Sequence, residues 1–355
     1  ISKFGFVDTI RDGFILNYIY FVFIILLFQY SIQALLKSIF NIYKYYPIIL
    51  FSLYIISLNN FFGNISLFGN IHLLFFKFGD IAVHLFIAFI LQLTSLNKYK
   101  KPFDLINYIL IFILFSVASS YSRSGMLSFI IAFIFFYYFL NDKLIKTQLK
   151  SFIKFIPIVF AISLLFLSKF KVADNFQGRT VGVEQVALNF TSIFSTSEEG
   201  GLNDNKIWRL LWWGQIIDYT FNGPYFIAGK GLGINLAEDD QILTTDLEGE
   251  LRSPHNFSLS ILARYGVFIF CIWLYWIYQQ LKIIKTPALS KLQLVIICIQ
   301  IAFLFNANFD VFLEGPMGAF PFWVFVGIDL ICNYFKLYNT ILEKDLFNIA
   351  IENHD

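Results

Sequence analysis

The chain has little charge and little cysteine, and each shortage excludes a class of protein. Asp, Glu, Lys and Arg make up 14% of its 355 residues, against roughly 25% in an average soluble protein. A soluble globule needs a polar surface that so few charges do not supply. The odd number of cysteines, each inside an apolar run, excludes a disulfide framework and a cysteine metal site; they are Cys271, Cys298 and Cys332.

Histidine is scarce as well, and no metal or nucleotide site is predicted. The four histidines are scattered and form no ligand cluster with carboxylates; they are His72, His84, His255 and His354. The glycine-rich stretch 229–233 lacks the spacing of a phosphate-binding loop, so we interpret it as a turn. We therefore expect no metal, no cofactor and no nucleic-acid partner.

Apolar residues are abundant and fall in runs long enough to cross a membrane. They make up 58% of the chain, which includes 46 Phe. A span needs about 20 mostly apolar residues, and we assign nine spans: about 14–36, 44–58, 79–97, 103–121, 124–140, 152–170, 254–278, 291–308 and 316–335. Small and polar residues at 119–125 break the run 103–140 into a hairpin. The sequence predicts an all-α, polytopic transmembrane helical bundle of about nine spans, and its start at Ile1 rather than Met leads us to expect that upstream residues are missing.

The distribution of lysine predicts which side of the membrane each loop faces. Alternate short loops are rich in lysine, and those between them are not. Because basic loops stay in the cytoplasm, the segment 171–253, with twelve acidic and six basic residues, faces outward. Loops of this length are commonly functional. We therefore divide the chain into N-terminal transmembrane helices at 1–104, a core at 105–278 that includes this long outer loop with short helices, and C-terminal helices with a cytoplasmic tail at 279–355.

Arginine is rare, and all of it is predicted on the outer side. The six residues lie outside the spans or in their outer parts: Arg11, Arg123, Arg179, Arg209, Arg252 and Arg264. Lysine supplies the positive charge that sets the orientation in the membrane. Arginine differs from lysine because its planar guanidinium can bind phosphate or carboxylate through two hydrogen bonds. The asymmetry indicates anion recognition on the outer face, and chance in a lysine-biased composition is the alternative.

The stretch 252–256 (Arg-Ser-Pro-His-Asn) opens the seventh span and is the strongest local feature. Ser253 is predicted as the helix N-cap and Pro254 as the first helical residue. His255 would then lie in the first turn, where the helix dipole attracts anions and disfavours a charged imidazole. A neutral histidine beside an anion site suits a general base; the alternative is a histidine that only caps the helix.

Residues 205–222 are predicted to form an amphipathic helix. One apolar face is formed at three- and four-residue spacing by Ile207, Leu210, Leu211, Gly214 and Ile217. Trp208, Trp212 and Trp213 suit the lipid headgroup layer, so the helix could lie on the outer leaflet and hold Arg209 at phosphate depth. An ordinary packing helix of the outer loop is the alternative.

Four further ionisable residues lie within the predicted spans. Asp80 and His84 are four residues apart on one helix face, and Arg264 and Asp329 lie in the seventh and ninth spans. Such residues often form proton or substrate pathways, which would fit a transporter of polysaccharide or carrier lipid. They could equally satisfy one another inside the bundle.

Taken in order along the chain, these motifs resemble the O-antigen ligase and O-antigen polymerase superfamily. The resemblance covers roughly 105–275. It is carried by the hairpin at 122–125 (Ser-Arg-Ser-Gly), the Trp-Arg-Leu-Leu-Trp-Trp stretch at 208–213, Pro224 with the glycine-rich turn at 229–233, and Ser-Pro-His-Asn at 253–256 with Gly266 beyond.

The resemblance implies a bacterial inner-membrane enzyme that transfers a saccharide from a polyprenyl diphosphate to an acceptor on the periplasmic face. By motif, the two arginines and the histidine of the family fall on Arg123, Arg209 and His255 as catalytic residues. Arg252, Arg179 and Asn256 are candidates for substrate binding. The implied partners are the lipid-linked oligosaccharide, a glycan or lipid acceptor and the bilayer. Polymerase is the preferred activity, and O-antigen ligase, which attaches the glycan to lipid A–core or another acceptor, is the alternative.

Overall fold

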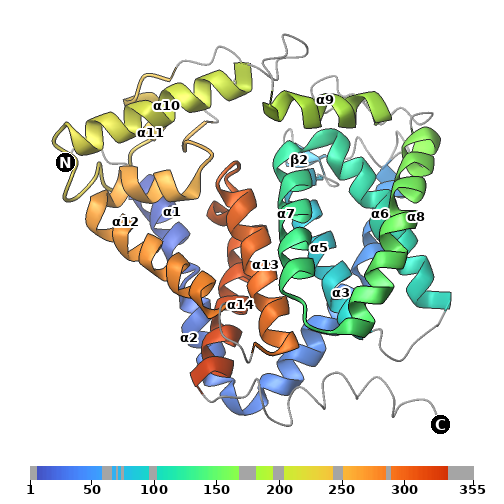
Figure 1. The fold of residues 1–355 in the computed structure, drawn as a ribbon. Helices are drawn as coiled ribbons and strands as arrows, with labels where there is room; N and C mark the ends of the chain where they lie inside the picture. Colours follow the sequence, from blue (N-terminus) through green and yellow to red (C-terminus); the bar gives the residue numbers. More distant parts are fainter. Residues whose placement is uncertain are drawn as a thin grey trace. The chain divides into compact units, whose positions relative to one another are not determined.

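The computed structural model describes residues 6–57, 66–68, 71–72, 76–95, 102–167, 181–194, 204–242, 251–284 and 289–334 (Figure 1). These residues are almost entirely helical. The described strands are β1 (Ser66–Phe68) and β2 (Ile71–His72), which pair as a short antiparallel hairpin. The predicted all-α helical class is confirmed.

The chain divides into two compact units, each built from separate parts of the sequence. The first unit contains Ile1–Leu26, Ser195–Leu289 and Phe303–Gly327. The second contains Leu27–Phe194, Ser290–Ala302 and Ile328–Asp355. Two late helices, α13 (Lys291–Ala307) and α14 (Pro316–Tyr334), contribute residues to both units.

The second unit is a helical bundle around α5 (Phe78–Ser95). This helix packs against α3 (Ile32–Ser57), α6 (Pro102–Tyr121) and α7 (Arg123–Phe139). The side chains of Leu85, Phe86 and Ile87 are completely buried, so α5 is covered on every side. The unit also holds α8 (Lys143–Leu167) and α9 (Val183–Phe194), both of which pack against α6.

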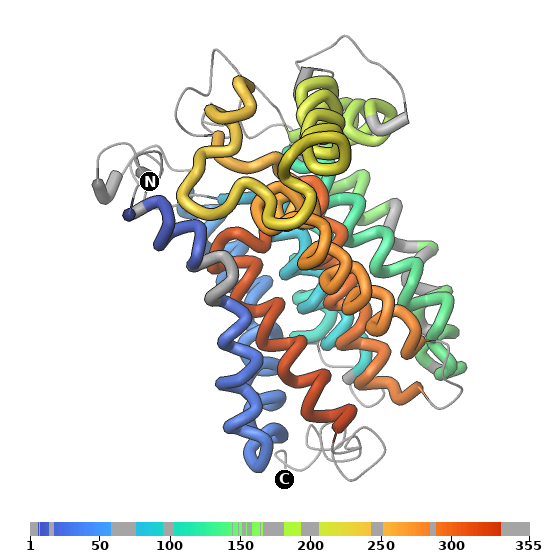
Figure 2. Tube along the Cα trace, turned by 90° about the vertical axis from the view of Figure 1, so that its left-hand side faces the viewer, coloured from blue at the N-terminus to red at the C-terminus, as the bar shows by residue number. Residues whose placement is uncertain are grey.

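The first unit combines α1 (Phe6–Asn17) and most of α2 (Tyr20–Leu27) with the segment around α12 (Phe257–Ile283). Preceding α12 in the chain are α10 (Asp204–Phe221) and the short α11 (Leu236–Asp239). A 3-10 turn, η4 (Phe312–Glu314), joins the end of α13 to the start of α14. Figure 2 shows α10 and the yellow segment that follows it gathered around the beginning of α12.

Four described helices are long and apolar enough to cross a membrane. They are Gln29–Ser57, Phe103–Tyr121, Phe257–Ile283 and Pro316–Tyr334. Three shorter apolar helices are Phe78–Thr94, Arg123–Phe139 and Lys291–Ala307. A multi-helix membrane protein is therefore supported, and the number of nine spans stays a prediction.

The break predicted between the first two spans is wrong. The helix α3 continues without interruption through Lys37 and Lys44, and the chain turns earlier, at the 3-10 segment Gln29–Ser31. Residues 32–46 contain neither Gly nor Pro, and a lysine alone does not end a helix because its stem can extend toward water. One turn before Pro47, the Lys44 carbonyl accepts a hydrogen bond from Asn107 Nδ2 at 2.9 Å.

Candidate functional site

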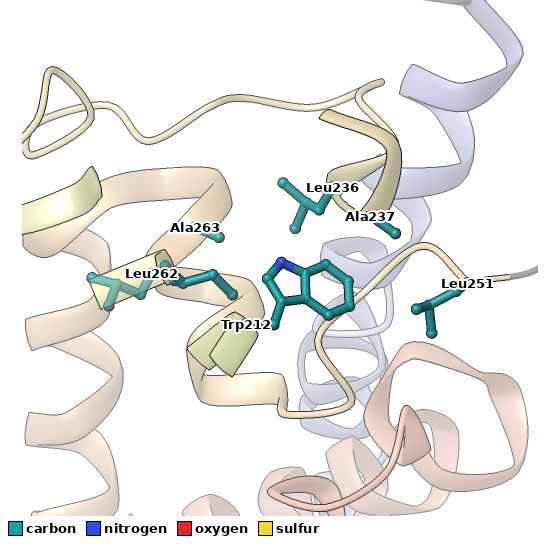
Figure 3. Close-up of a cluster of buried hydrophobic side chains, with 7 residues drawn as sticks. Trp212, Leu236, Ala237, Leu251, Leu262 and Ala263 are labelled. Atoms are coloured by element: carbon teal, nitrogen blue, oxygen red, sulfur yellow. The ribbon is translucent and has the colours of Figure 1, made fainter. Parts of the chain in front are cut away.

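In the first unit, the candidate site rests on a small apolar core under α10. Trp212 and Ile216 are completely buried there. Figure 3 shows Trp212 among the labelled side chains of this core. They pack with residues from the following loop, from α11 and from α12: Leu236, Ala237, Leu251, Leu262 and Ala263. This packing fixes the rotation of α10 about its axis, and therefore the direction in which Arg209 points.

The prediction of a helix at 205–222 is confirmed, but its Trp residues are not all placed for a headgroup layer. Trp212 is buried in the protein core. The face predicted to be apolar is exposed on the protein, with Leu210 54% and Leu211 69% accessible. The spacing of apolar residues found the helix but not its buried side, because α10 carries large apolar residues on both faces.

An ion-pair cluster borders this core. Trp212 Nε1 donates to an Asp240 carboxylate oxygen, and Lys230 Nζ pairs with Asp240 and, at 2.7 Å, with Asp239. The same ammonium lies 4.2 Å from the ring centroid of Tyr219. Burial opposes the charge on Lys230, but its bonds to the two carboxylates outweigh that penalty and raise its pKa. The lysine of the glycine-rich turn is thus a structural cation.

The glycine-rich turn also supports α12 at a break in that helix. Gly266 has φ 76° and ψ −172°, so α12 is two helices joined at this residue. The freed carbonyls of Ala263 and Arg264 accept hydrogen bonds from the backbone N–H groups of Lys230 and Gly231, at 2.8 and 2.9 Å. A Cβ on Gly266 would lie 2.4 Å from the Ile227 carbonyl oxygen. Only glycine therefore allows the turn to approach so closely.

His255 lies just before α12, and not in its first turn as predicted. The N-cap is Asn256, whose side chain accepts a hydrogen bond from Leu259 N at 3.0 Å, and the helix begins at Phe257. Asn ranks among the strongest N-cap residues, which explains why it displaces Ser253 from that role. His255 has φ 52°, a backbone conformation that costs free energy and is concentrated at functional sites.

The structure brings Arg209 and His255 together. Arg209 Nη2 lies 3.4 Å from His255 Nδ1, and its Nη1 donates to the Phe309 carbonyl at 3.1 Å. Trp208 contacts both groups: its ring meets His255 edge-on at 5.7 Å and lies 5.3 Å from the Arg209 guanidinium. Trp213 Nε1 donates to the Pro254 carbonyl at 2.8 Å and so ties α10 to the histidine segment.

This contact assigns the nitrogen atoms of His255. A guanidinium has only donors, so Nδ1 is the acceptor toward Arg209 and the proton of the neutral ring is on Nε2. The lone pair on Nδ1 becomes available as a base only when Arg209 turns to another acceptor. A phosphate entering beside Arg209 would provide that acceptor.

Arg252 lies in the same unit but faces carboxylates. Its guanidinium is 3.4 Å from Asp8 and 3.5 Å from Asp12, both on α1. Arg11 pairs with Asp8 at 3.0 Å, and the buried Arg264 pairs with Asp12 at 2.8 Å. Arg252 and Arg264 are therefore parts of a network of ion pairs that holds α1 in place. Arg179 lies outside the described residues, and the Asn256 side chain is occupied as the helix cap.

Arg123 belongs to the second unit, at the first position of α7. The predicted hairpin is confirmed, since α6 ends at Tyr121 and Ser122 caps α7 by accepting from Gly125 N at 3.1 Å. Arg123 Nη1 donates to Ser192 on α9 at 3.3 Å. The fully buried Asn189 of α9 donates to the carbonyls of Ser119 and Ser120, at 2.8 and 2.7 Å. The helix α9 therefore fixes the hairpin that carries Arg123.

The pair Asp80 and His84 has partners elsewhere in the second unit. Lys77 Nζ lies 3.2 Å from Asp80, and Tyr43 OH is 2.9 Å from His84 Nδ1. Of the two interpretations of these ionisable residues, this arrangement favours structural pairing over a proton pathway. Among the described residues there is no group of three or more His, Cys, Asp or Glu placed to hold a metal ion.

Sequence reasoning missed the turn between α13 and α14. Phe309 supplies the carbonyl that holds Arg209, Asn308 accepts from Ser258 at 3.1 Å, and Glu314 accepts from Ser260 at 2.8 Å. The turn is about fifty residues beyond His255, and no motif marks it. A carboxylate directly before Gly315-Pro316 is the one local signal that could have drawn attention to it.

One known protein family matches the part of the chain that carries the predicted catalytic residues. A family model described as O-antigen ligase matches residues 108–274, from within α6 to within α12. No curated protein and no solved structure matches the chain significantly. The match includes Arg123, Arg209 and His255 and confirms the resemblance found in the sequence. Residues 108–274 of this chain with long apolar helices are thus similar to the O-antigen ligase family, and this similarity supports the O-antigen ligase and polymerase superfamily.

Proposed function

We propose that the protein is a bacterial inner-membrane glycosyltransferase that moves a saccharide from a polyprenyl diphosphate to an acceptor at the periplasmic face, and that it acts as a polymerase. The observation that carries the proposal is the contact of Arg209 with His255. Arg209 lies in the segment 171–253, which the lysine distribution predicts to face outward, and His255 follows directly after that segment. We also propose that the chain crosses the membrane nine times and that residues 105–278 form the core that carries the activity.

In the proposed reaction, Arg209 and Arg123 bind the diphosphate and stabilise the negative charge that develops as it leaves. Turning toward the diphosphate removes Arg209 from His255 Nδ1, which then takes the proton of the acceptor hydroxyl. The acceptor oxygen forms a bond to the anomeric carbon, and the bond from that carbon to the diphosphate oxygen breaks. The leaving group is already activated, so the step needs neither ATP nor a metal ion.

The test is the surface glycan of a deletion strain that carries the wild-type gene or the His255→Ala variant. Single repeat units on the acceptor in the deletion, restored to long chains by the wild type and not by His255→Ala, would support a polymerase that uses this histidine. Full restoration by His255→Ala would eliminate the proposed base. Unchanged glycan in the deletion strain would contradict the proposed function.

A ligase is the second candidate, because the matching family is described as O-antigen ligase. Ligase and polymerase share the donor and differ in the acceptor, which is lipid A–core or another molecule for a ligase. Gel electrophoresis of the glycan from the same strains separates the two activities. Long polymer that accumulates on the lipid carrier, with none on the acceptor, would identify the protein as a ligase.

A further inference from the structure

The turn 308–314, which lies outside the segment that matches the family, contacts the candidate site at three points. At its start, Asn308 Oδ1 accepts from Ser258 Oγ at 3.1 Å. Next, the Phe309 carbonyl accepts from Arg209 Nη1 at 3.1 Å. At its end, Glu314 Oε1 accepts from Ser260 Oγ at 2.8 Å. Two of these contacts reach the first turn of α12, and the third reaches the arginine.

Glu314 is the chemically unusual member of the turn. Burial raises the pKa of its carboxyl, against the opposing effects of the Ser260 and Ser253 hydroxyls and of Arg264; Asp12 raises it further. A carboxyl group is rarely placed in such surroundings unless its hydrogen bonds hold something in position. The hydroxyl that donates to it, Ser260 Oγ, lies in the first turn of α12, five residues after His255.

We infer that Glu314 is a positioning residue of the candidate site, which fixes the His255 segment through Ser260 while the neighbouring Phe309 carbonyl fixes Arg209. His255 needs this support because its backbone is held at φ 52°, which the free chain disfavours. Without the carboxyl, the first turn of α12 loses a partly buried hydrogen bond, and His255 moves away from the guanidinium. The inference concerns the same site as the proposed function.

The experiment measures how fast diethyl pyrocarbonate modifies His255 in the purified, detergent-solubilised protein, by mass spectrometry of peptides. His84, which is bonded to Tyr43 in the second unit, is the internal control for folding. Removal of the hydrogen bond in Glu314→Ala should raise the rate at His255 about fivefold, with the rate at His84 unchanged. Glu314→Gln keeps the acceptor oxygen and should stay within about twofold of the wild type. Glu238→Gln, at an exposed carboxylate of the same unit, is the matched control.

Wild-type reactivity of His255 in Glu314→Ala would overturn the inference. If Glu314→Ala also increases the modification of His84, the variant has not folded, and Ser260→Ala is used in its place. A higher modification rate at His255 alone in Ser260→Ala supports the positioning role, and an unchanged rate refutes it. This readout involves no glycan. It can therefore fail while His255→Ala still abolishes polymer, or succeed while the proposed reaction is wrong.

Discussion

Arg209 is the residue on which most of the site geometry depends, because its guanidinium joins three separate parts of the first unit. One nitrogen reaches the Phe309 carbonyl, the other reaches His255, and the plane lies beside Trp208. A lysine carries the same charge but has one nitrogen on a flexible stem. It can occupy one of these contacts at a time.

Arg209→Lys should therefore lose most of the proposed polymerising activity. The loss of one charge-assisted hydrogen bond, worth about 1.5–3 kcal/mol, corresponds to roughly a tenfold to hundredfold lower rate. The measurement is the initial rate of glycan extension in membranes that contain equal amounts of each protein. Lys206→Gln, one turn earlier on α10, is the control and should keep wild-type activity. Equal rates for Arg209→Lys and the wild type would refute the bidentate role.

A second residue-scale prediction follows from the raised pKa of Glu314. The fold favours the protonated carboxyl, so its contribution to stability is complete below the unfolded pKa of about 4.3 and is lost as pH rises through the higher folded value. The melting temperature of the wild type should therefore fall relative to that of Glu314→Gln between pH 4.5 and pH 8. If the melting temperature of the wild type instead rose relative to that of Glu314→Gln as the pH increased, this prediction would be contradicted.

At the scale of elements, α10 is anchored by the face opposite to its exposed apolar stripe. Trp212 is completely buried, whereas the neighbouring Leu211 is 69% accessible. Trp212→Ala should lower the free energy of unfolding by about 3–5 kcal/mol. Leu211→Ala should change it by no more than about 0.5 kcal/mol. Thermal unfolding in detergent compares the two variants. Similar losses for both would show that α10 is rotated relative to the structure described here.

The hairpin of α6 and α7 depends on close contact with α5. A Cβ on Gly125 would lie 2.9 Å from Gly79 Cα and 2.9 Å from Ala82 Cβ. Gly125→Val should therefore displace the start of α7, which carries Arg123, and cost about 1–3 kcal/mol. Gly214→Ala is the control, since nothing lies within 4 Å of its Cβ and a helical alanine stabilises by about 0.5–1 kcal/mol. A lower melting temperature for Gly125→Val, with a higher one for Gly214→Ala, is the expected result.

At the scale of the whole molecule, the predicted orientation in the membrane can be tested with single cysteines. In a Cys271→Ala background, which removes the exposed native cysteine, Asn222→Cys should react with a membrane-impermeant maleimide in intact spheroplasts. Lys143→Cys should react only after permeabilisation, because lysine-rich loops stay in the cytoplasm. Both positions are exposed on the protein. The reverse pattern would invert the topology and place the candidate site in the cytoplasm.

The sequence by itself determined the properties that depend on local pattern. Long apolar runs predict membrane helices because each span must satisfy its own backbone, and the ends of α5, α6, α7, α13 and α14 agree with the predictions to within about two residues. The small and polar cluster at 119–125 predicted the hairpin for the same local reason. The motifs around Arg209 and His255 could also be recognised in the sequence, because each lies within a short stretch of chain.

Only the tertiary structure decided which of these residues meet. Arg252 and Arg209 look alike in the sequence, yet Arg252 faces the carboxylates of α1, more than two hundred residues away, and Arg209 faces His255. The buried side of α10 and the role of Glu314 likewise depend on contacts between distant segments. Such contacts follow from packing and buried charge over the whole fold, and a local pattern of side chains does not contain them.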